Sequence, residues 1–539
     1  MPGVGMPLVI LPGLCTIRVL IGLSCECGMT SEASTVSASA NTTRSIARNA
    51  AALAIASIIS KGALLFWQLV LARLLTPAEY GIYGTIGGML VIAAVIPEFG
   101  MGIIVIRDVA QRREQAGQYL TSTFTMQPLL ALVAYMLLLG AGYAFGYGEE
   151  ILLLLPLAGL TMFADLLGNM VHNQLLAHEQ MVIPSIIGVV HILLLIMMVF
   201  VALAGGGGLV GLYGATIAAS LLRAIFYWLT LFRYKVRLKW PINRVLLRML
   251  MLNGAPVMAS TFMSLAYQHV DKLVMTATIG PESTALLMAA FILVSGVVEL
   301  LNTTVLVAVF PMMSQQYGAG DFEAFNFLID KLSFLTLVLT VPIGVAISVL
   351  ASDVIALLFS PEYTRTTDIL QILIWFGVVM MYGNVFAQML LIQNRQIRLF
   401  IIRALGLLLN VVLLLVLLPR MGAPGAGVSS VVAQLLILVL LLRQWELAGD
   451  YLRRVGPRIG RMILVSLLMA AVMSGIKLLA VDVTGPVRLL WVLGALVAGT
   501  LVYAVLAWFG GVIAPEDRRF IRQVLVSIPG GTIIERWWA

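Results

Sequence analysis

Several ionisable side chains stand inside stretches of this sequence that are otherwise apolar. An ionisable group at the middle of a lipid bilayer costs roughly 2.5–3.5 kcal/mol, so each one needs an oppositely charged partner or a water-filled cavity. Groups of this kind either hold helices together as ion pairs or line a path for ions and charged solutes. The candidates are Lys61, Glu98, Asp165, Arg223, Asp271, Lys272 and Glu299.

The composition explains why these positions are expected to be embedded in a membrane. Of the 539 residues, 61% are hydrophobic and only 11% are charged, and the mean hydropathy is +1.03. A soluble chain of this length could not keep its surface hydrated with so few charges. The net charge of +8 does not indicate nucleic-acid binding, because the excess Lys and Arg residues lie in short loops beside apolar stretches, where they set orientation.

Stretches of about 20 or more apolar residues predict an all-α polytopic membrane protein with about 14 transmembrane helices. An even number places both ends of the chain on the same side of the membrane. The predicted spans are 46–72, 81–106, 119–146, 151–176, 183–204, 209–232, 250–279, 284–314, 325–350, 366–392, 397–418, 424–443, 460–481 and 487–511.

The loops between these spans alternate in charge. Lys and Arg gather in every second loop, as in 233–248 and 443–461, and are nearly absent from the others. About 24 cations fall on one side and about four on the other, which is the positive-inside pattern. We therefore expect a multi-pass membrane protein with both termini in the cytoplasm. The four exceptions are Arg73, Arg365, Arg420 and Arg488.

The first 43 residues have a different composition. They contain all three cysteines of the chain, Cys15, Cys25 and Cys27, and end in a polar run over residues 31–43. The two closest cysteines are not followed by a second pair of ligands, so a metal site is not expected. We expect 1–43 to be a disordered leader, with Met29 as an alternative start.

The chain also repeats itself. The Pro-containing loop at Pro77 is echoed 204 residues later at Pro281, and the Gly-rich start of span six at Gly211 is echoed 211 residues later at Gly422. Two echoes at similar offsets predict two six-helix lobes in parallel repeat around a central path, an arrangement of many transporters. The expected division is an N-lobe at 44–235 with spans one to six, a C-lobe at 236–445 with spans seven to twelve, and 446–539 with two further spans and a cytoplasmic tail.

The depths of the embedded charges sort them into two groups. Counting 1.5 Å per residue from the outer loops places Asp165 and Arg223 both about 21 Å down within the N-lobe, which predicts a structural ion pair. The remaining charges come from spans one, two, seven and eight, which hold corresponding positions in the two halves. We expect them to meet at the central path, with pairing of Lys61 and Glu98 within one lobe as the structural alternative.

Asp271 and Lys272 are neighbours in span seven. They point about 100° apart on a helix and so cannot pair on one face. At least one must face the cavity or find a partner on another span. His269 is a candidate for a proton relay with them, although a single embedded histidine is more often packed or hydrogen-bonded.

No catalytic arrangement emerges from the sequence. Ser, His and Asp do not gather at a recognisable spacing, and no Gly-rich phosphate loop ends in Lys-Ser or Lys-Thr. The glycine run at 205–208 is expected to be a connector. We expect a protein that is not an enzyme, that uses no cofactor, and that takes any work it does from an ion gradient, the membrane potential or the downhill flow of its substrate.

Two motifs resemble those of a known family. The run Leu69-Val-Leu-Ala-Arg-Leu-Leu-Thr-Pro-Ala-Glu-Tyr-Gly81, and Val270-Asp-Lys-Leu273 followed by Phe310-Pro-Met-Met-Ser314, are similar to the first-loop and span-seven to span-eight patterns of Wzx-like oligosaccharide flippases. These are polysaccharide biosynthesis proteins of the multidrug/oligosaccharidyl-lipid/polysaccharide (MOP) exporter superfamily. The resemblance covers residues 44 to about 445.

This resemblance implies a V-shaped pair of lobes that flips a polyprenyl-diphosphate-linked oligosaccharide from the cytoplasmic to the outer leaflet by alternating access. Cations of the cavity would meet the diphosphate, a role that falls to Lys61, Lys272 and, at the inner mouth, Arg107. Glu98, Asp271 and Glu299 would be candidates for coupling to H⁺ or Na⁺. The expected partners are the lipid-linked substrate and the bilayer, and a monomer is the default.

Two other functions remain open on the sequence alone. One is a cation-coupled multidrug exporter of the same superfamily, although that class usually has twelve spans. The other is a membrane glycosyltransferase or polymerase, which generally carries a large extramembrane loop. The longest gap here, roughly residues 233–249, is too short for such a domain.

Overall fold

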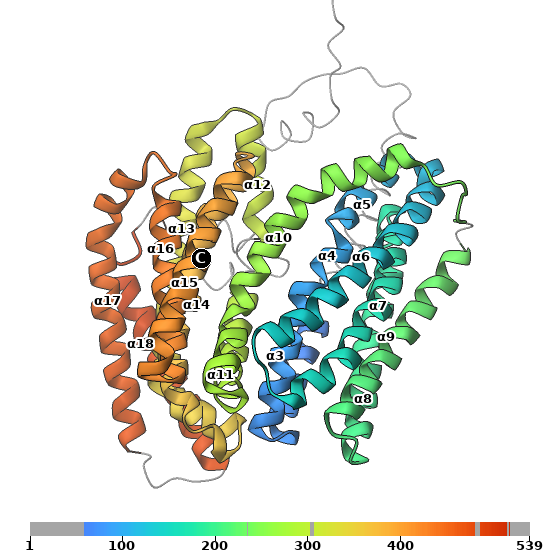
Figure 1. The fold of residues 1–539 in the computed structure, drawn as a ribbon. Helices are drawn as coiled ribbons and strands as arrows, with labels where there is room; N and C mark the ends of the chain where they lie inside the picture. Colours follow the sequence, from blue (N-terminus) through green and yellow to red (C-terminus); the bar gives the residue numbers. More distant parts are fainter. Residues whose placement is uncertain (1–58, 234–235, 302–306, 480–485, 515–516, 518–539) are drawn as a thin grey trace, which may run out of the picture. The chain divides into compact units, whose positions relative to one another are not determined.

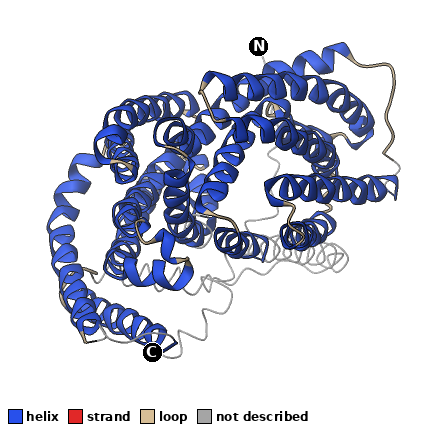
Figure 2. Cartoon of the chain, turned by 60° about the horizontal axis from the view of Figure 1, so that its bottom comes forward, coloured by secondary structure: helices blue, strands red, loops and turns tan. Residues whose placement is uncertain are grey.

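A computed structural model describes residues 59–233, 236–301, 307–479, 486–514 and 517. All of these belong to one of the two compact units of the chain, residues 56–539. The ordered elements among them are helices, and strands are absent from this part of the chain (Figures 1 and 2). The prediction of an all-α fold is confirmed. The predicted leader lies outside the described residues.

Thirteen helices in the described part of the chain are long and apolar enough to cross a membrane. They correspond to the predicted spans two to fourteen. The first predicted span, 46–72, lies partly outside the described residues, and its described end forms a helix over residues 59–74. The protein is therefore a multi-pass membrane protein.

Two sets of helices are defined by their mutual contacts. In the first set α7 packs against α6 and α9, and α8 packs against α9. In the second set α14 packs against α13 and α16, and α15 packs against α10 and α16. The first set comprises α3 (Pro77–Ala93), α4 (Val95–Glu98), α5 (Met101–Gln111), α6 (Ala116–Ala144), α7 (Glu149–Ala177), α8 (Val182–Ala204) and α9 (Gly208–Arg233). The second comprises α10 (Arg244–Ile279), α11 (Pro281–Leu301), α12 (Val307–Gly318), α13 (Phe322–Leu358), α14 (Thr366–Ile392), α15 (Gln396–Met421) and α16 (Ala423–Leu442).

The second predicted span is broken, which corrects the expectation of one continuous helix over 81–106. Helix α3 ends at Ala93, and α4 and α5 follow as separate pieces. Pro97 has no N–H to donate to the preceding turn. Phe99 and Gly100 then adopt left-handed backbone conformations, with φ of 47° and 68°. The span therefore changes direction next to Glu98, the last residue of α4.

Helix α10 contacts both sets. Near its beginning, Leu246 and Leu250 share a buried apolar cluster with Met101 of α5 and Tyr119 of α6. Its later turns pack against α15 and α16 of the second set and against α3 of the first. One 36-residue helix therefore connects the two sets along much of its length.

The end at which α3 and α11 begin is closed by small residues. A Cβ atom on Gly81 would overlap the backbone carbonyl of Pro281, so the two helices approach as closely as glycine allows. Hydroxyls join the same contact, with Thr85 and Thr276 Oγ1 atoms 2.5 Å apart and Thr276 and Thr284 Oγ1 atoms 2.7 Å apart. Glycine and paired hydroxyls therefore allow close packing of α3 and α11 at this end.

The last two helices are attached to α13 by buried charges that the sequence did not reveal. Helix α17 (Ala448–Leu478) packs against α13 and α18 (Pro486–Phe509). Asp353 of α13 has a side chain only 7% exposed and lies 2.8 Å from Lys477 Nζ and 2.7 Å from Arg488 Nη2. Elsewhere on α13, Lys331 Nζ lies 2.5 Å from Asp517.

Asp353→Leu is expected to loosen these two helices. It leaves the cations of Lys477 and Arg488 without their shared carboxylate. Breaking a buried pair costs about 3–5 kcal/mol. We expect roughly 2–3 kcal/mol here because both cations keep some water. The measurement is the apparent melting temperature of the purified protein. Asp353→Leu combined with Lys477→Leu and Arg488→Leu should recover much of the loss, and an unchanged melting temperature in the single variant would contradict the attachment.

Candidate functional site

Lys61 and Glu299 form an ion pair between the first helix and α11. The pair therefore joins a helix of the first half of the sequence to one of the second. Their side chains remain 47% and 40% exposed, so a solute could reach them. Lys61 therefore pairs with Glu299. It does not form the pair with Glu98 that was the structural alternative from the sequence.

Arg107 lies on α5, outside the helices long enough to span the membrane. Its side chain is 61% exposed, and its Nε donates a 2.8 Å hydrogen bond to Asp108. This hydrogen bond raises the pKa of Arg107 above its usual value. The guanidinium therefore stays charged and keeps its remaining N–H donors available.

Asp165 and Arg223 are brought together as the depths predicted. Arg223 Nη2 on α9 lies 2.8 Å from Asp165 Oδ1 on α7. The guanidinium side chain is 17% exposed, whereas the carboxylate is 44% exposed and lines a cavity. The two charges neutralise each other at the edge of that cavity.

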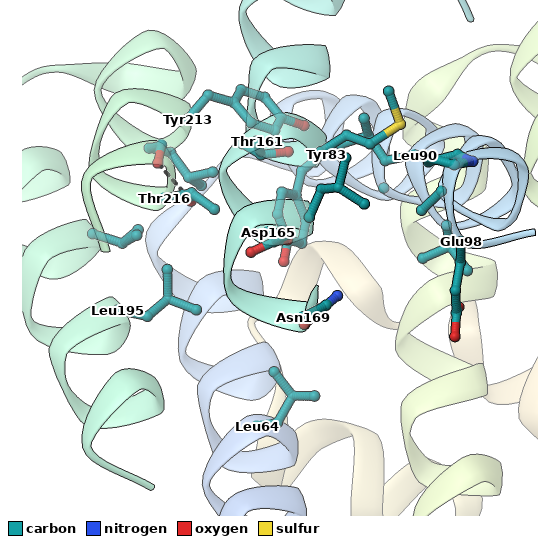
Figure 3. A pocket seen from close by; sticks show the side chains of 18 of the residues that line it. Leu64, Tyr83, Leu90, Glu98, Thr161, Asp165, Asn169, Leu195, Tyr213 and Thr216 are labelled. Carbon is teal, nitrogen blue, oxygen red and sulfur yellow. Dashed lines mark hydrogen bonds between the residues drawn. The ribbon is translucent and has the colours of Figure 1, made fainter. Parts of the chain in front are cut away.

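The cavity lies within the first set of helices and has a volume of about 330 Å³. The helix over 59–74, α3, α4, α6, α7, α8 and α9 all contribute to its lining. Figure 3 shows Asp165 and Asn169 on neighbouring turns of one helix, with Tyr213 and Thr216 on one side and Glu98 on the other. Among the described residues Glu98 forms no hydrogen bond or ion pair. Glu98 and Asn173 both lie close to Gly102. A Cβ atom at position 102 would lie 3.1 Å from Glu98 Oε1 and 2.8 Å from Asn173 Nδ2.

Asp271 is enclosed by the second set of helices and does not join Lys61 and Glu299. Its side chain is 2% exposed. Asn410 Nδ2 of α15 donates to Oδ1 at 2.5 Å, and Ser430 Oγ of α16 donates to Oδ2 at 2.7 Å. Asn410 Oδ1 is buried and finds no hydrogen-bond partner among the described residues. The site therefore combines a carboxylate with an unpaired amide oxygen, both of which favour a cation or a proton.

Lys272 points away from Asp271 into a separate contact. Its ammonium lies 5.8 Å from the ring centroid of Phe291 on α11 and 3.4 Å from His269 Nδ1. His269 also lies against Gly88 of α3. His269 therefore contacts Lys272, and among the described residues it forms no direct hydrogen bond to Asp271 that could serve a relay.

Sequence reasoning missed both neutral partners of Asp271. Asn410 is a lone amide in the apolar run 404–418, and such a group is expensive in a membrane without a partner. That signal could have indicated Asn410 as a site residue. Ser430 carries no comparable signal, because a serine hydroxyl in a helix can donate a hydrogen bond to a backbone carbonyl of the preceding turn. Ser430 Oγ also lies within hydrogen-bond distance of Ala426 O.

The paired helix sets, the broken second span and the buried polar groups describe a membrane transporter fold. Solved structures with this fold include the lipid II flippase MurJ in an inward closed conformation (TM-score 0.70, 17% identity, 85% of this chain and 98% of that one). Another is an inward-facing multidrug resistance MATE family transporter of the MOP superfamily (TM-score 0.60, 15% identity, 75% and 99%). These likenesses establish the fold.

The family follows from the sequence match. Residues 46–316 match the polysaccharide biosynthesis protein family, which is half of the chain, and the chain belongs to that family. Residues 255–499 are similar to the lipid II flippase MurJ family. A curated relative, an uncharacterized membrane protein of Methanocaldococcus jannaschii, is 22% identical over 189 residues, and the match spans 37% of that protein and 35% of this chain. The resemblance to the MOP superfamily is confirmed.

Proposed function

We propose that the protein is a flippase that moves a polyprenyl-diphosphate-linked oligosaccharide from the cytoplasmic to the outer leaflet by alternating access. Its family supports this reading, as do the names of its flippase relatives. The site is the region where the two helix sets meet, and the protein acts as a transporter in the bacterial inner membrane, with both termini cytoplasmic, as a monomer.

The ion pair of Lys61 and Glu299 is the observation that carries this proposal. It joins the helix over 59–74 to α11 of the second set and is half exposed, so separation of these two helices must break it or a ligand must replace one partner. A diphosphate is a stronger multidentate partner for an ammonium than a single carboxylate. Substrate entry would therefore exchange Glu299 for diphosphate at Lys61. Arg107, at the inner mouth, would supply a first contact, and Lys272 a later one.

Coupling is assigned to Asp271. A carboxylate this well buried, which accepts hydrogen bonds from two neutral donors among the described residues, is costly while it stays charged. Binding of H⁺ or Na⁺ removes that cost. Helix α10 carries Asp271 and contacts both helix sets. A change in the charge of the carboxylate would therefore change the packing of the helix that connects them. Glu98 and Glu299 are then assigned to the substrate path.

Lys61→Gln is expected to slow flipping about tenfold or more, since a hydrogen bond to a charged group contributes about 1.5–3 kcal/mol. Lys61→Arg should retain most of the rate because the charge remains. The measurement is movement of a fluorescent polyprenyl-diphosphate-linked oligosaccharide between leaflets of proteoliposomes. Glu299→Gln serves as the matched control, because it removes the same ion pair and leaves the cation in place.

Equal loss in Lys61→Gln and Glu299→Gln would show that the ion pair itself matters and would contradict a diphosphate contact at Lys61. In cells, deletion of the gene should remove one surface glycan. Retention of every glycan together with loss of drug resistance would instead favour the multidrug exporter.

A further inference from the structure

The cavity inside the first helix set is unsuited to phosphate. None of its lining residues, all of which belong to the described part of the chain, is Lys or Arg. Arg223 stands behind Asp165 and is neutralised by it. Glu98 adds a negative charge. An anionic diphosphate would therefore be repelled here, and the cavity has to serve another part of the substrate or another ligand.

Two buried polar groups of the lining have no hydrogen-bond partner in the described part of the chain. Gln127 Oε1 of α6 and the Tyr213 hydroxyl of α9 are buried, make no hydrogen bond among the described residues, and belong to side chains that are each 3% exposed. Both residues line the cavity. Leaving such a group unsatisfied costs about 1–3 kcal/mol, so the cavity is built to be filled by something that forms hydrogen bonds.

The rest of the lining is largely aliphatic, with polar and aromatic side chains placed among the Leu, Val, Met, Ala and Pro residues. Asn169, Asn173 and Thr216 add amides and a hydroxyl, while Trp67 and Tyr83 add aromatic surface. Amides supply both donors and acceptors, and aromatic rings cover apolar faces. A sugar ring presents this combination, with hydroxyl or N-acetyl groups at its edge and C–H groups on its faces.

The cavity adjoins the proposed phosphate site. Leu64, Trp67 and Leu71 line it from the first helix, and Lys61 precedes Leu64 by three residues. Residues three apart on a helix share a face with Cβ atoms about 5–6 Å apart. A group in the cavity and a group on Lys61 can therefore belong to one molecule.

We infer that this cavity binds an uncharged sugar unit of the lipid-linked substrate while its diphosphate contacts Lys61. The inference rests on the proposed function and names the part of the substrate that the cavity selects. A volume of about 330 Å³ is at the lower end for small-molecule sites, so the cavity holds one end of the glycan and the rest stays in the central path.

The test compares two probes that differ only in the sugar. Purified protein in nanodiscs is titrated with undecaprenyl diphosphate and with undecaprenyl diphosphate N-acetylglucosamine. The double variant Gln127→Met and Asn169→Leu keeps side-chain volume and removes hydrogen-bonding groups. We expect it to bind the sugar-bearing probe at least about tenfold more weakly, as two lost hydrogen bonds imply, with unchanged affinity for the bare diphosphate.

Two controls separate the possible outcomes. Gln371→Met makes the same chemical change on α14, away from the cavity, and should bind both probes as the wild type does. Lys61→Gln should weaken both probes alike. Unchanged binding of the sugar-bearing probe by the double variant would overturn the inference and leave the flippase proposal standing, whereas failure of the wild-type protein to bind either probe would overturn both.

An organic cation is the competing occupant, since Glu98 could pair with it. Tetraphenylphosphonium is the probe for this case. Binding that is lost in Glu98→Gln, together with an unaffected sugar-bearing probe in the double variant, would assign the cavity to cations and overturn the inference.

Discussion

Replacing Asp271 by asparagine is expected to slow flipping by about 5–150-fold, the range for a coupling free energy of 1–3 kcal/mol, and to abolish its dependence on the ion gradient. The physical reason is the loss of a group whose charge can change. Asp271 is 2% exposed and is the acid that α10 presents to α15 and α16. An asparagine stays neutral, so binding or release of H⁺ or Na⁺ no longer alters the helix contacts.

The substitution should leave the packing intact. The asparagine Oδ1 can accept from Asn410 Nδ2, and its amide can donate to Ser430 Oγ, whose own hydroxyl hydrogen can turn to Ala426 O at 2.9 Å. The melting temperature should therefore stay near that of the wild-type protein. A folding defect would show itself as a lower melting temperature, which separates it from a loss of coupling.

The measurement is the rate of flipping in proteoliposomes under an imposed Na⁺ gradient and, separately, under an imposed pH gradient. The gradient that drives the wild-type protein identifies the ion. Ser430→Ala is the matched control because it removes one hydrogen bond and keeps the carboxylate, so a dependence on the gradient should survive. A gradient response that persists in Asp271→Asn would assign coupling to another residue.

The sequence indicates which charges lie in apolar stretches and predicts one of their pairings, but it leaves the other partners undetermined, for a physical reason. Asp165 and Arg223 come from one helix set, where equal depth was enough to bring them together. Counting about 1.5 Å per residue from the outer loops places Lys61, Glu98 and Glu299 within about 4 Å of the same depth. Depth alone does not show whether Lys61 pairs with Glu98 or with Glu299, because the pairing depends on how the helices are rotated and how the two sets meet.

Two other features could not be predicted from the sequence. Asp353 and Arg488 lie at the ends of apolar stretches, where the sequence predicts loops, yet the carboxylate of Asp353 is buried against α17 and α18. Phe99 is a residue for which a left-handed conformation is uncommon, so the break between α4 and α5 could not be predicted there. Both features need knowledge of the neighbouring helices.

Gly81→Val is expected to disrupt closure of the end at which α3 and α11 begin, the outer end in the orientation proposed above. The new side chain would overlap the carbonyl of Pro281, a backbone atom that cannot rotate aside. Overpacking of this kind costs typically about 1–3 kcal/mol, which shifts the closed population by about 5–150-fold. Alternating access requires both closed ends, so flipping should fall by a comparable factor.

Closure can be measured with a cysteine at position 85. Thr85 is fully buried against Thr276, so Thr85→Cys, in a chain whose three native cysteines are replaced by serine, should react slowly with a membrane-impermeant maleimide. Adding Gly81→Val should raise the labelling rate. Gly140→Val is the control, because a Cβ there meets open space.

The opposite bias should come from Gly254→Val, where a Cβ would overlap the carbonyl of Phe99 at the break after α4. Weakening that contact favours the state in which the α3 and α11 end is closed, so labelling at position 85 should fall below that of the parent cysteine variant while flipping is again slowed. If the two contacts close alternately, both glycine substitutions slow flipping, but they change the labelling rate at position 85 in opposite directions. Labelling that rises in both variants would mean that they merely loosen α3 and α10, and would contradict alternation between these ends.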